Sequence, residues 1–222
     1  GVIVKECGVA EFSYAFAINM LCDPDFNVQQ KLETLEVPIQ YSEQAKKLRH
    51  FVKGKHPTEK IKILRDKTTS NCKFSDEEIA KFQIMAQRSY IEKNYPMEKY
   101  KIKEIDQVFN KIRQITNIQI VALTANEQDQ AQWLLKHAQV HQFFDYIIGY
   151  DLNNTKTEKT KIDLIGNYLQ NKVANKKIMI GDGIPDMQAG KANGCTCFGI
   201  GHNLIQHGAD LAFSEGEEYN KL

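Results

Sequence analysis

Two carboxylates in the C-terminal half of the chain have the type and spacing to hold a cation. Asp182 and Asp186 follow the apolar run 178–180 and Gly181, and they are four residues apart. The run predicts a short buried strand that turns directly into a helix. Ligands of open α/β sheets bind beyond the carboxyl ends of strands, and Mg²⁺ prefers carboxylate oxygen. The simpler alternative is an Asp-Gly turn followed by an acid near a helix N-terminus, where negative charge is favoured.

Short apolar runs alternate with amphipathic segments in the parts of the chain that must position these acids. The runs that predict strands are residues 2–4, 118–123, 144–148, 178–180 and 196–200. Apolar residues at helical spacing lie between most of them. This alternation predicts an α/β fold with a parallel sheet covered on both faces by helices.

A long helical segment interrupts the alternation after the first strand. From Tyr14 to about Tyr100 the apolar residues recur at helical spacing, and Ser75 with Glu78 has the pattern of a capping box. In the helix that follows, residues 79, 82, 85 and 86 are predicted to form one buried stripe. We therefore predict two domains, one of residues 1–14 and 101–222 and an all-helical one of residues 15–100.

Composition limits the function classes. The chain has 222 residues, 42% hydrophobic and 26% charged, with a formal net charge of +1. These values are ordinary for a globular protein and give no overall attraction to nucleic acid or membranes. No apolar run approaches the roughly 20 residues of a membrane span, and no signal-peptide pattern is found. Five scattered cysteines argue against a disulfide framework and favour a reducing, cytoplasmic location. Cys195 and Cys197 flank one residue of a predicted strand and are expected to be core thiols.

The stretch Lys46–Lys67 is distinctly basic. It holds nine Lys and Arg residues and two His residues, and Glu59 and Asp66 are its acids. Such a stretch either binds an anionic partner or forms a solvated helix face. Aromatic residues of the kind that stack on single-stranded nucleic acid are nearly absent from it, so nucleic acid is not expected as a partner.

The segment around the two acids resembles a known family. Residues 181–194, Gly-Asp-Gly-Ile-Pro-Asp-Met-Gln-Ala-Gly-Lys-Ala-Asn-Gly, follow an apolar strand and resemble the fourth motif of the haloacid dehalogenase (HAD) superfamily. In that motif the two acids hold a catalytic Mg²⁺, which assigns Asp182 and Asp186 as metal ligands. The resemblance implies a three-layer α/β core with an inserted helical cap, as in phosphoglycolate-phosphatase-like members, and residues 208–213 resemble the family's last strand.

Two further motifs follow from the same resemblance. Thr124, Ala125 and Asn126 end the predicted strand 118–123 and match the second motif, which binds the substrate phosphoryl group. A hydroxyl followed by backbone N–H groups at a helix start is an anion site, although Thr124 as a plain N-cap fits equally well. The third motif is a lysine before a helix. We assign it to Lys159, with Lys156 and Lys161 as the nearby alternatives.

The first motif departs from the family. Aligned on Gly8-Val9, the nucleophile position falls on Lys5 and the acid/base position on Cys7. Lys5 and Lys159 together would balance both remaining acids, and their charge opposes a divalent cation, so Mg²⁺ is implied by the family but expected to bind poorly. A lysine beside two acids keeps its proton and cannot attack phosphorus. Cys7 as nucleophile is an alternative that requires a lowered thiol pKa.

These residues lead to one principal functional hypothesis and two alternatives. The principal hypothesis is a HAD-fold protein with impaired catalysis that keeps a cleft for small phosphorylated molecules or binds a protein partner through its cap. The first alternative is an active Mg²⁺-dependent phosphatase of small phosphorylated metabolites. The second is anion or nucleic-acid binding through the stretch Lys46–Lys67.

Overall fold

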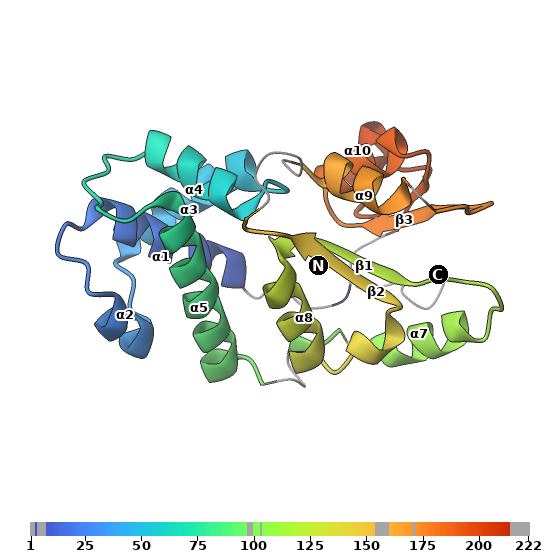
Figure 1. The fold of residues 1–222 in the computed structure, drawn as a ribbon, viewed down its shortest axis with the longest axis horizontal. Helices are drawn as coiled ribbons and strands as arrows, with labels where there is room; N and C mark the ends of the chain where they lie inside the picture. Colours follow the sequence, from blue (N-terminus) through green and yellow to red (C-terminus); the bar gives the residue numbers. More distant parts are fainter. Residues whose placement is uncertain are drawn as a thin grey trace. The chain divides into compact units, whose positions relative to one another are not determined.

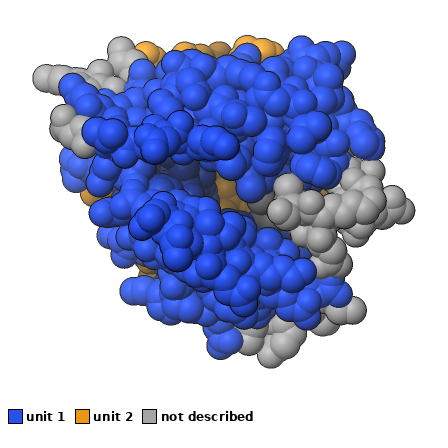
Figure 2. Space-filling view, turned by 90° about the vertical axis from the view of Figure 1, so that its right-hand side faces the viewer, with its two compact units in different colours: residues 1–5, 101–222 blue, residues 6–100 orange. Residues whose placement is uncertain are grey.

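The chain divides into two compact units, and each is described here by itself. The computed structural model describes residues 3, 8–96, 100–102, 104–153, 160–170 and 172–213. One unit, the helical unit, comprises residues 6–100; the other, the α/β unit, comprises residues 1–5 and 101–222 (Figure 1). Figure 2 shows the atoms of the two units in different colours. Among the described residues, none of the helices combines the length and apolar character that a membrane crossing requires.

The helical unit is built around its first helix. Its helices are α1 (Val9–Cys22), α2 (Val28–Thr34), α3 (Ile39–Val52), α4 (Pro57–Asp66) and α5 (Asp76–Asn94). Phe16, Ile18 and Leu21 of α1 are fully buried, because the helix is apolar on all sides and contacts α3, α4 and α5. The predicted division between residues 14 and 15 lies within α1, which runs unbroken through that point.

The capping box at the start of α5 is confirmed. The Ser75 hydroxyl accepts the Glu78 N–H at 3.2 Å, and the Glu78 carboxylate accepts the Ser75 N–H at 2.8 Å. Ile79 is buried as predicted, but Met85 is half exposed, so its place in the buried stripe is wrong. Residue 83 lies one helical turn beyond Ile79, whereas residue 85 points away from that face. Gln83 therefore takes the buried position.

The α/β unit contains two parallel sheets among the described residues. Its elements are α7 (Ile105–Arg113), β1 (Val121–Glu127), α8 (Gln128–His137), β2 (Tyr146–Tyr150), α9 (Lys161–Leu169), β3 (Ile178–Gly181), α10 (Ile184–Ala192), β4 (Thr196–Ile200) and β5 (Leu211–Phe213), with short 3₁₀ turns at His141–Phe143 and His202–His207. β1 pairs with β2, and β4 lies between β3 and β5. Helices α8 and α10 cover these strands, and α9 contacts α10 and both strands of the first sheet (Figure 1). The predicted α/β class is confirmed.

The three-stranded sheet has its own small core. Met187, Cys197, Leu204 and Ala209 are buried together, and Met179 and Cys195 pack against them. The prediction that both thiols belong to the core is confirmed. Helix α10 approaches the sheet closely because residue 190 is Gly: a Cβ there would lie 2.6 Å from the Cys197 sulfur.

An ion pair at the start of β2 predicts a pH-dependent stability of the α/β unit. The Asp145 carboxylate accepts the Ile120 N–H at 2.7 Å and two hydrogen bonds of 3.1 Å from Arg113. The Ile120 N–H, and after it the Arg113 guanidinium, hold the pKa of Asp145 below 3.8, its ordinary value. A carboxyl group whose pKa is lower in the folded than in the unfolded state stabilises the fold fully above its unfolded-state pKa. This stabilisation is lost as the pH falls through the folded-state pKa. We expect the free energy of unfolding, measured in urea, to fall with acidification below about pH 4 less steeply in Asp145→Asn than in the wild-type chain. If the free energy of unfolding fell equally steeply with acidification in both proteins, the stabilising role of Asp145 would be contradicted.

Candidate phosphate and metal site of the α/β unit

Asp186 is held in place by the turn between β3 and α10. Its carboxylate accepts the Gly183 N–H at 3.0 Å, and its own N–H donates to the Gly183 carbonyl at 3.0 Å, which makes a capping arrangement at the start of α10. Gly181, the last residue of β3, lies directly under this side chain. A Cβ at residue 181 would approach the Asp186 Cγ to 2.7 Å, so the observed position of the carboxylate requires Gly there.

Lys161 supplies the positive charge next to Asp186. It is the first residue of α9, and its Nζ forms an ion pair with Oδ1 of Asp186. The side chains are 14% and 9% exposed, so water screens this pair little. The other oxygen of Asp186 accepts the Gly183 N–H. Both oxygens of Asp186 are therefore engaged within the protein.

Two sets of hydrogen bonds fix the start of α9 against α10. Thr160 and Asp163 form a capping box, in which the Asp163 carboxylate accepts the Thr160 N–H at 2.8 Å and the Thr160 hydroxyl at 2.9 Å. The Asn193 side chain donates to the carbonyls of Ile162 and Ala189 at 3.2 and 2.9 Å. These hydrogen bonds fix the backbone from which the Lys161 side chain reaches Asp186.

The structure bears on the choice of the site lysine. Lys159, the predicted one, and Lys156 lie outside the described residues, so the role of Lys159 stays a prediction. Lys161, the remaining candidate, is the lysine that contacts Asp186. The pattern Thr160-x-x-Asp163 was the signal in the sequence that could have placed Lys161 at the first position of the helix.

The predicted phosphate-binding residues form a bulge in β1. The predicted strand ended at Leu123, but β1 continues to Glu127. Leu123 pairs with Ile148 and Glu127 pairs with Tyr150, so Thr124, Ala125 and Asn126 lie opposite the single residue between those partners. The Thr124 hydroxyl accepts the Asn126 N–H at 3.2 Å and closes the bulge. The three residues are thus brought together on one short bend, as bulges near binding sites commonly are.

Gly149 and Gln128 hold the bulge against β2, and sequence reasoning missed both. The Gln128 side chain donates to the Ile147 carbonyl at 2.9 Å and accepts the Gly149 N–H at 2.7 Å. The Gln128 side chain thereby satisfies a backbone carbonyl and a backbone N–H of β2 at the bulge, where the hydrogen bonds between β1 and β2 are interrupted. A Cβ on Gly149 would lie 2.8 Å from the Asn126 carbonyl oxygen and 2.9 Å from the Gln128 Cα, so only Gly fits.

The N-cap of α8 corrects two expectations about the anion site. The cap is Glu127, whose carboxylate accepts the N–H groups of Asp129 and Gln130, both at 2.8 Å. Thr124 is therefore not an N-cap, because the strand continues three residues beyond it. The amide groups of Asp129 and Gln130 are also not available to a phosphoryl group, since a carboxylate of the chain already uses them. An anion at this point would depend on the Thr124 hydroxyl and the backbone of the bulge.

The described residues do not suit Mg²⁺ by themselves. Asp182 is half-buried in the turn before α10, but Asp186 already has a partner for each oxygen. Within the described ranges, no three His, Cys, Asp or Glu side chains are grouped in a way that could hold a metal. Mg²⁺ favours several oxygen ligands with unbalanced negative charge, which an acid paired with lysine does not supply. Lys5 and Cys7, the predicted substitutions in the first motif, lie outside the described residues.

Much of the charge of the basic stretch is used inside the helical unit. Arg49 forms an ion pair with Glu11, and Arg65 forms one with Asp76 at 2.8 Å. Lys60 is buried. The exposed basic residues are Lys46, Lys47, His50, Lys53, Lys62 and Lys67. Lys46 is paired with Glu43 at 2.9 Å, and Lys67 lies over the Phe51 ring at 3.9 Å.

Comparisons with known proteins agree with this architecture. The family model described as haloacid dehalogenase-like hydrolase matches residues 29–200. Similar solved structures include a predicted phosphatase from Clostridium acetobutylicum, with 21% identity, 96% of this chain and 91% of that chain covered and a TM-score of 0.60. CbbY from Rhodobacter sphaeroides in complex with phosphate has 13% identity, coverage of 95% and 88% and a TM-score of 0.65. A haloacid dehalogenase-like family protein from Streptococcus pneumoniae has 17% identity, coverage of 95% and 88% and a TM-score of 0.55. A comparison with curated proteins gave no match.

The family match covers well over half of the chain, so this protein belongs to the haloacid dehalogenase-like hydrolase family. Its fold is the phosphatase fold of that family, as the similar structures show. Members of the family usually use Mg²⁺.

Proposed function

We propose that this chain is a HAD-family protein with impaired phosphohydrolase chemistry, which binds small phosphorylated molecules at the bulge of β1 without turning them over. The observation that carries the proposal is the ion pair between Lys161 and Asp186, which neutralises one acid of the fourth motif inside the protein. The substitutions Lys5 and Cys7 in the first motif support it, because neither side chain supplies the carboxylate that the family uses there. Binding of a protein partner by the helical unit is compatible with the same loss of chemistry.

The electrostatic balance explains why Mg²⁺ is expected to bind weakly. An ammonium about 4 Å from a carboxylate is attracted by about 4 kcal/mol at an effective dielectric constant near 20. Moving Lys161 away from Asp186 to admit a cation would forfeit that attraction and leave a poorly hydrated ammonium beside the new charge. At the nucleophile position that the family resemblance assigns to it, Lys5 would add a second positive charge near the same acids.

The activity assay and the Mg²⁺ titration test the proposal together. We expect calorimetric titration to show no Mg²⁺ binding tighter than about 1 mM, and a generic aryl phosphate to be hydrolysed no faster in the presence of the chain than in its absence. Inorganic phosphate should still bind, more weakly in Thr124→Val, which keeps the shape of the side chain and removes the hydroxyl. Micromolar Mg²⁺ binding, or turnover that is lost in Asp182→Asn, would overturn the proposal.

The second candidate is an active Mg²⁺-dependent phosphatase, which the family match favours. The variant with Lys5→Asp and Cys7→Asp separates the two. If the remaining site residues are competent, the double variant gains turnover that the wild-type chain lacks. If the wild-type chain is the faster of the two, the second candidate replaces the first.

A further inference from the structure

The residues that directly precede Cys22 and Cys72 are in contact within the helical unit, although α2, α3 and α4 separate the two cysteines in the chain. Cys22 is the last residue of α1, and Cys72 lies in the segment 67–75 between α4 and α5. The Asn71 N–H donates to the Leu21 carbonyl at 3.1 Å. The residues directly before the two cysteines are therefore joined by a backbone hydrogen bond.

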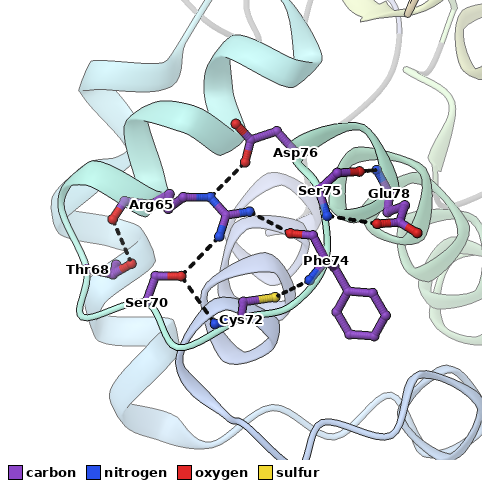
Figure 3. A network of polar contacts seen from close by, with 8 residues as sticks. All are labelled: Arg65, Thr68, Ser70, Cys72, Phe74, Ser75, Asp76 and Glu78. Carbon is purple, nitrogen blue, oxygen red and sulfur yellow. Dashed lines mark hydrogen bonds and ion pairs between the residues drawn. The ribbon is translucent and has the colours of Figure 1, made fainter.

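Arg65 fixes the segment that presents Cys72. Its guanidinium donates to the Asp76 carboxylate at 2.8 Å, to the Ser70 hydroxyl at 3.1 Å and to the Phe74 carbonyl at 2.8 Å (Figure 3). Ser70 and Phe74 flank Cys72 two residues away on each side. The Cys72 sulfur accepts the Phe74 N–H at 3.4 Å. A planar cation with donors on three sides is well suited to order a short irregular segment.

The environment of Cys22 places a second contact between the same two segments. Burial raises the pKa of the Cys22 thiol, a hydrogen bond with the Thr68 side chain lowers it, and the neighbouring Cys72 raises it further. Thr68 belongs to the segment that carries Cys72, so two separate contacts link this segment to the end of α1. Both thiols are half-buried and thus partly accessible. Cys197, in contrast, is wholly buried in the core of the α/β unit.

We propose that Cys22 and Cys72 are a modification site, which closes into a reversible disulfide when the chain meets an oxidising low-molecular-weight disulfide. The bond would join the end of α1 to the segment 67–75 covalently. The hydrogen bond between the Asn71 N–H and the Leu21 carbonyl already holds the residues next to the two cysteines together, and a disulfide requires the two Cα atoms to lie within about 7 Å of each other.

The reaction is an exchange in two steps. The Cys72 thiolate attacks one sulfur of the oxidant, the oxidant's S–S bond breaks, and one small thiolate leaves. The Cys22 thiolate then attacks the Cys72 sulfur, the mixed disulfide breaks, and the second small thiolate leaves. Two protein thiols are oxidised, one small disulfide is reduced to two thiols, and the two protons lost by the protein are taken up by the leaving thiolates. Cys22 is assigned to the second step because burial disfavours its thiolate.

Oxidation of the full chain with glutathione disulfide tests the proposal. After unfolding and alkylation, mass spectrometry of the digested wild-type chain should show a peptide pair joined through Cys22 and Cys72, with no glutathione on either residue. In Cys22→Ser and Cys72→Ser the partner cysteine should instead carry glutathione, and the oxidant concentration for half-reaction should rise by about tenfold or more. Cys195→Ser is the matched control and should behave as the wild-type chain does.

The stability of the oxidised chain supplies a second measurement. Closing a long loop should raise the midpoint of thermal unfolding of the wild-type chain by about 5 °C or more, and a reductant should reverse the rise. Two glutathione adducts without an internal bond, a disulfide mapped to other cysteines, or a disulfide between two copies of the chain would each overturn the proposal. The wild-type peptide map decides this even if a Ser variant folds poorly.

Discussion

Replacing Asp186 with Ala is expected to destabilise the α/β unit by about 3 kcal/mol, because it leaves the ammonium of Lys161 buried without its partner. The same change removes the hydrogen bond that Asp186 accepts from the Gly183 N–H at the start of α10. Unfolding in urea, followed by circular dichroism, measures the difference. If the ion pair carries the effect, Lys161→Met should be nearly as costly as Asp186→Ala. The double variant should then lose less stability than the sum of the two single losses, by a coupling energy of about 0.5–3 kcal/mol.

The exposed pair between Lys191 and Asp210 is the matched control for this experiment. Its atoms are 2.6 Å apart, but its side chains are 43% and 41% exposed. Lys191→Met should therefore cost much less stability than Lys161→Met, since exposed pairs are screened by water and salt. Equal losses for Lys161→Met and Lys191→Met would show that the pair at Asp186 is not the balanced, buried contact on which the proposed function depends.

Gly149→Ala is expected to destabilise the chain by at least about 2 kcal/mol and to disturb the bulge at Thr124. The added methyl group would meet the Asn126 carbonyl oxygen at 2.8 Å and the Gln128 Cα and N at 2.9 Å. All three are backbone atoms, so no rotation of a side chain can relieve the overlap. Phosphate binding should weaken together with stability, because the bulge and its hydrogen bond between Thr124 and Asn126 would be displaced.

Gly166→Ala is the control for the volume of a methyl group. Gly166 lies inside α9, and the nearest atom to an added Cβ is the Asn193 side-chain oxygen at 3.4 Å. Alanine favours the helical backbone over glycine by about 1 kcal/mol, so this variant should be neutral or slightly more stable. A Gly149→Ala chain as stable as Gly166→Ala would contradict the tight approach of β2 to the bulge.

The strands and helix signals of the α/β unit could be predicted because their causes are local. The apolar runs at 178–180 and 196–200 coincide with β3 and β4, since a short apolar segment between turn residues has few alternatives to a buried strand. In the helical unit, the capping box at Ser75 is likewise a contact between residues three apart. The end of β1 was misplaced because a bulge depends on its partner strand, and the segment 118–127 alone does not specify it.

The ion pair between Lys161 and Asp186 could not be predicted, because it too depends on a contact with a part of the chain that is distant in sequence. Lys156, Lys159 and Lys161 have the same side chain within six residues, and the capping-box pattern at Thr160 indicates where a helix begins but not which acid a lysine contacts. The choice depends on the direction in which α9 starts, and that direction depends on Asn193 holding α9 to α10. The use of Glu127 as the cap of α8 has a similar origin, because Thr124 can cap a helix only if the strand ends before it, whereas β1 continues to Glu127.

By itself, the sequence determined the family resemblance and the fold class, and it predicts the two acids of the fourth motif and the substitutions Lys5 and Cys7, because each is a matter of residue type and short spacing. Only the tertiary structure decided that Lys161 neutralises Asp186, that Thr124 lies in a bulge supported by Gly149, and that Cys22 lies beside the segment of Cys72. These contacts join parts of the chain that are distant in sequence, and packing, not local preference, brings them together.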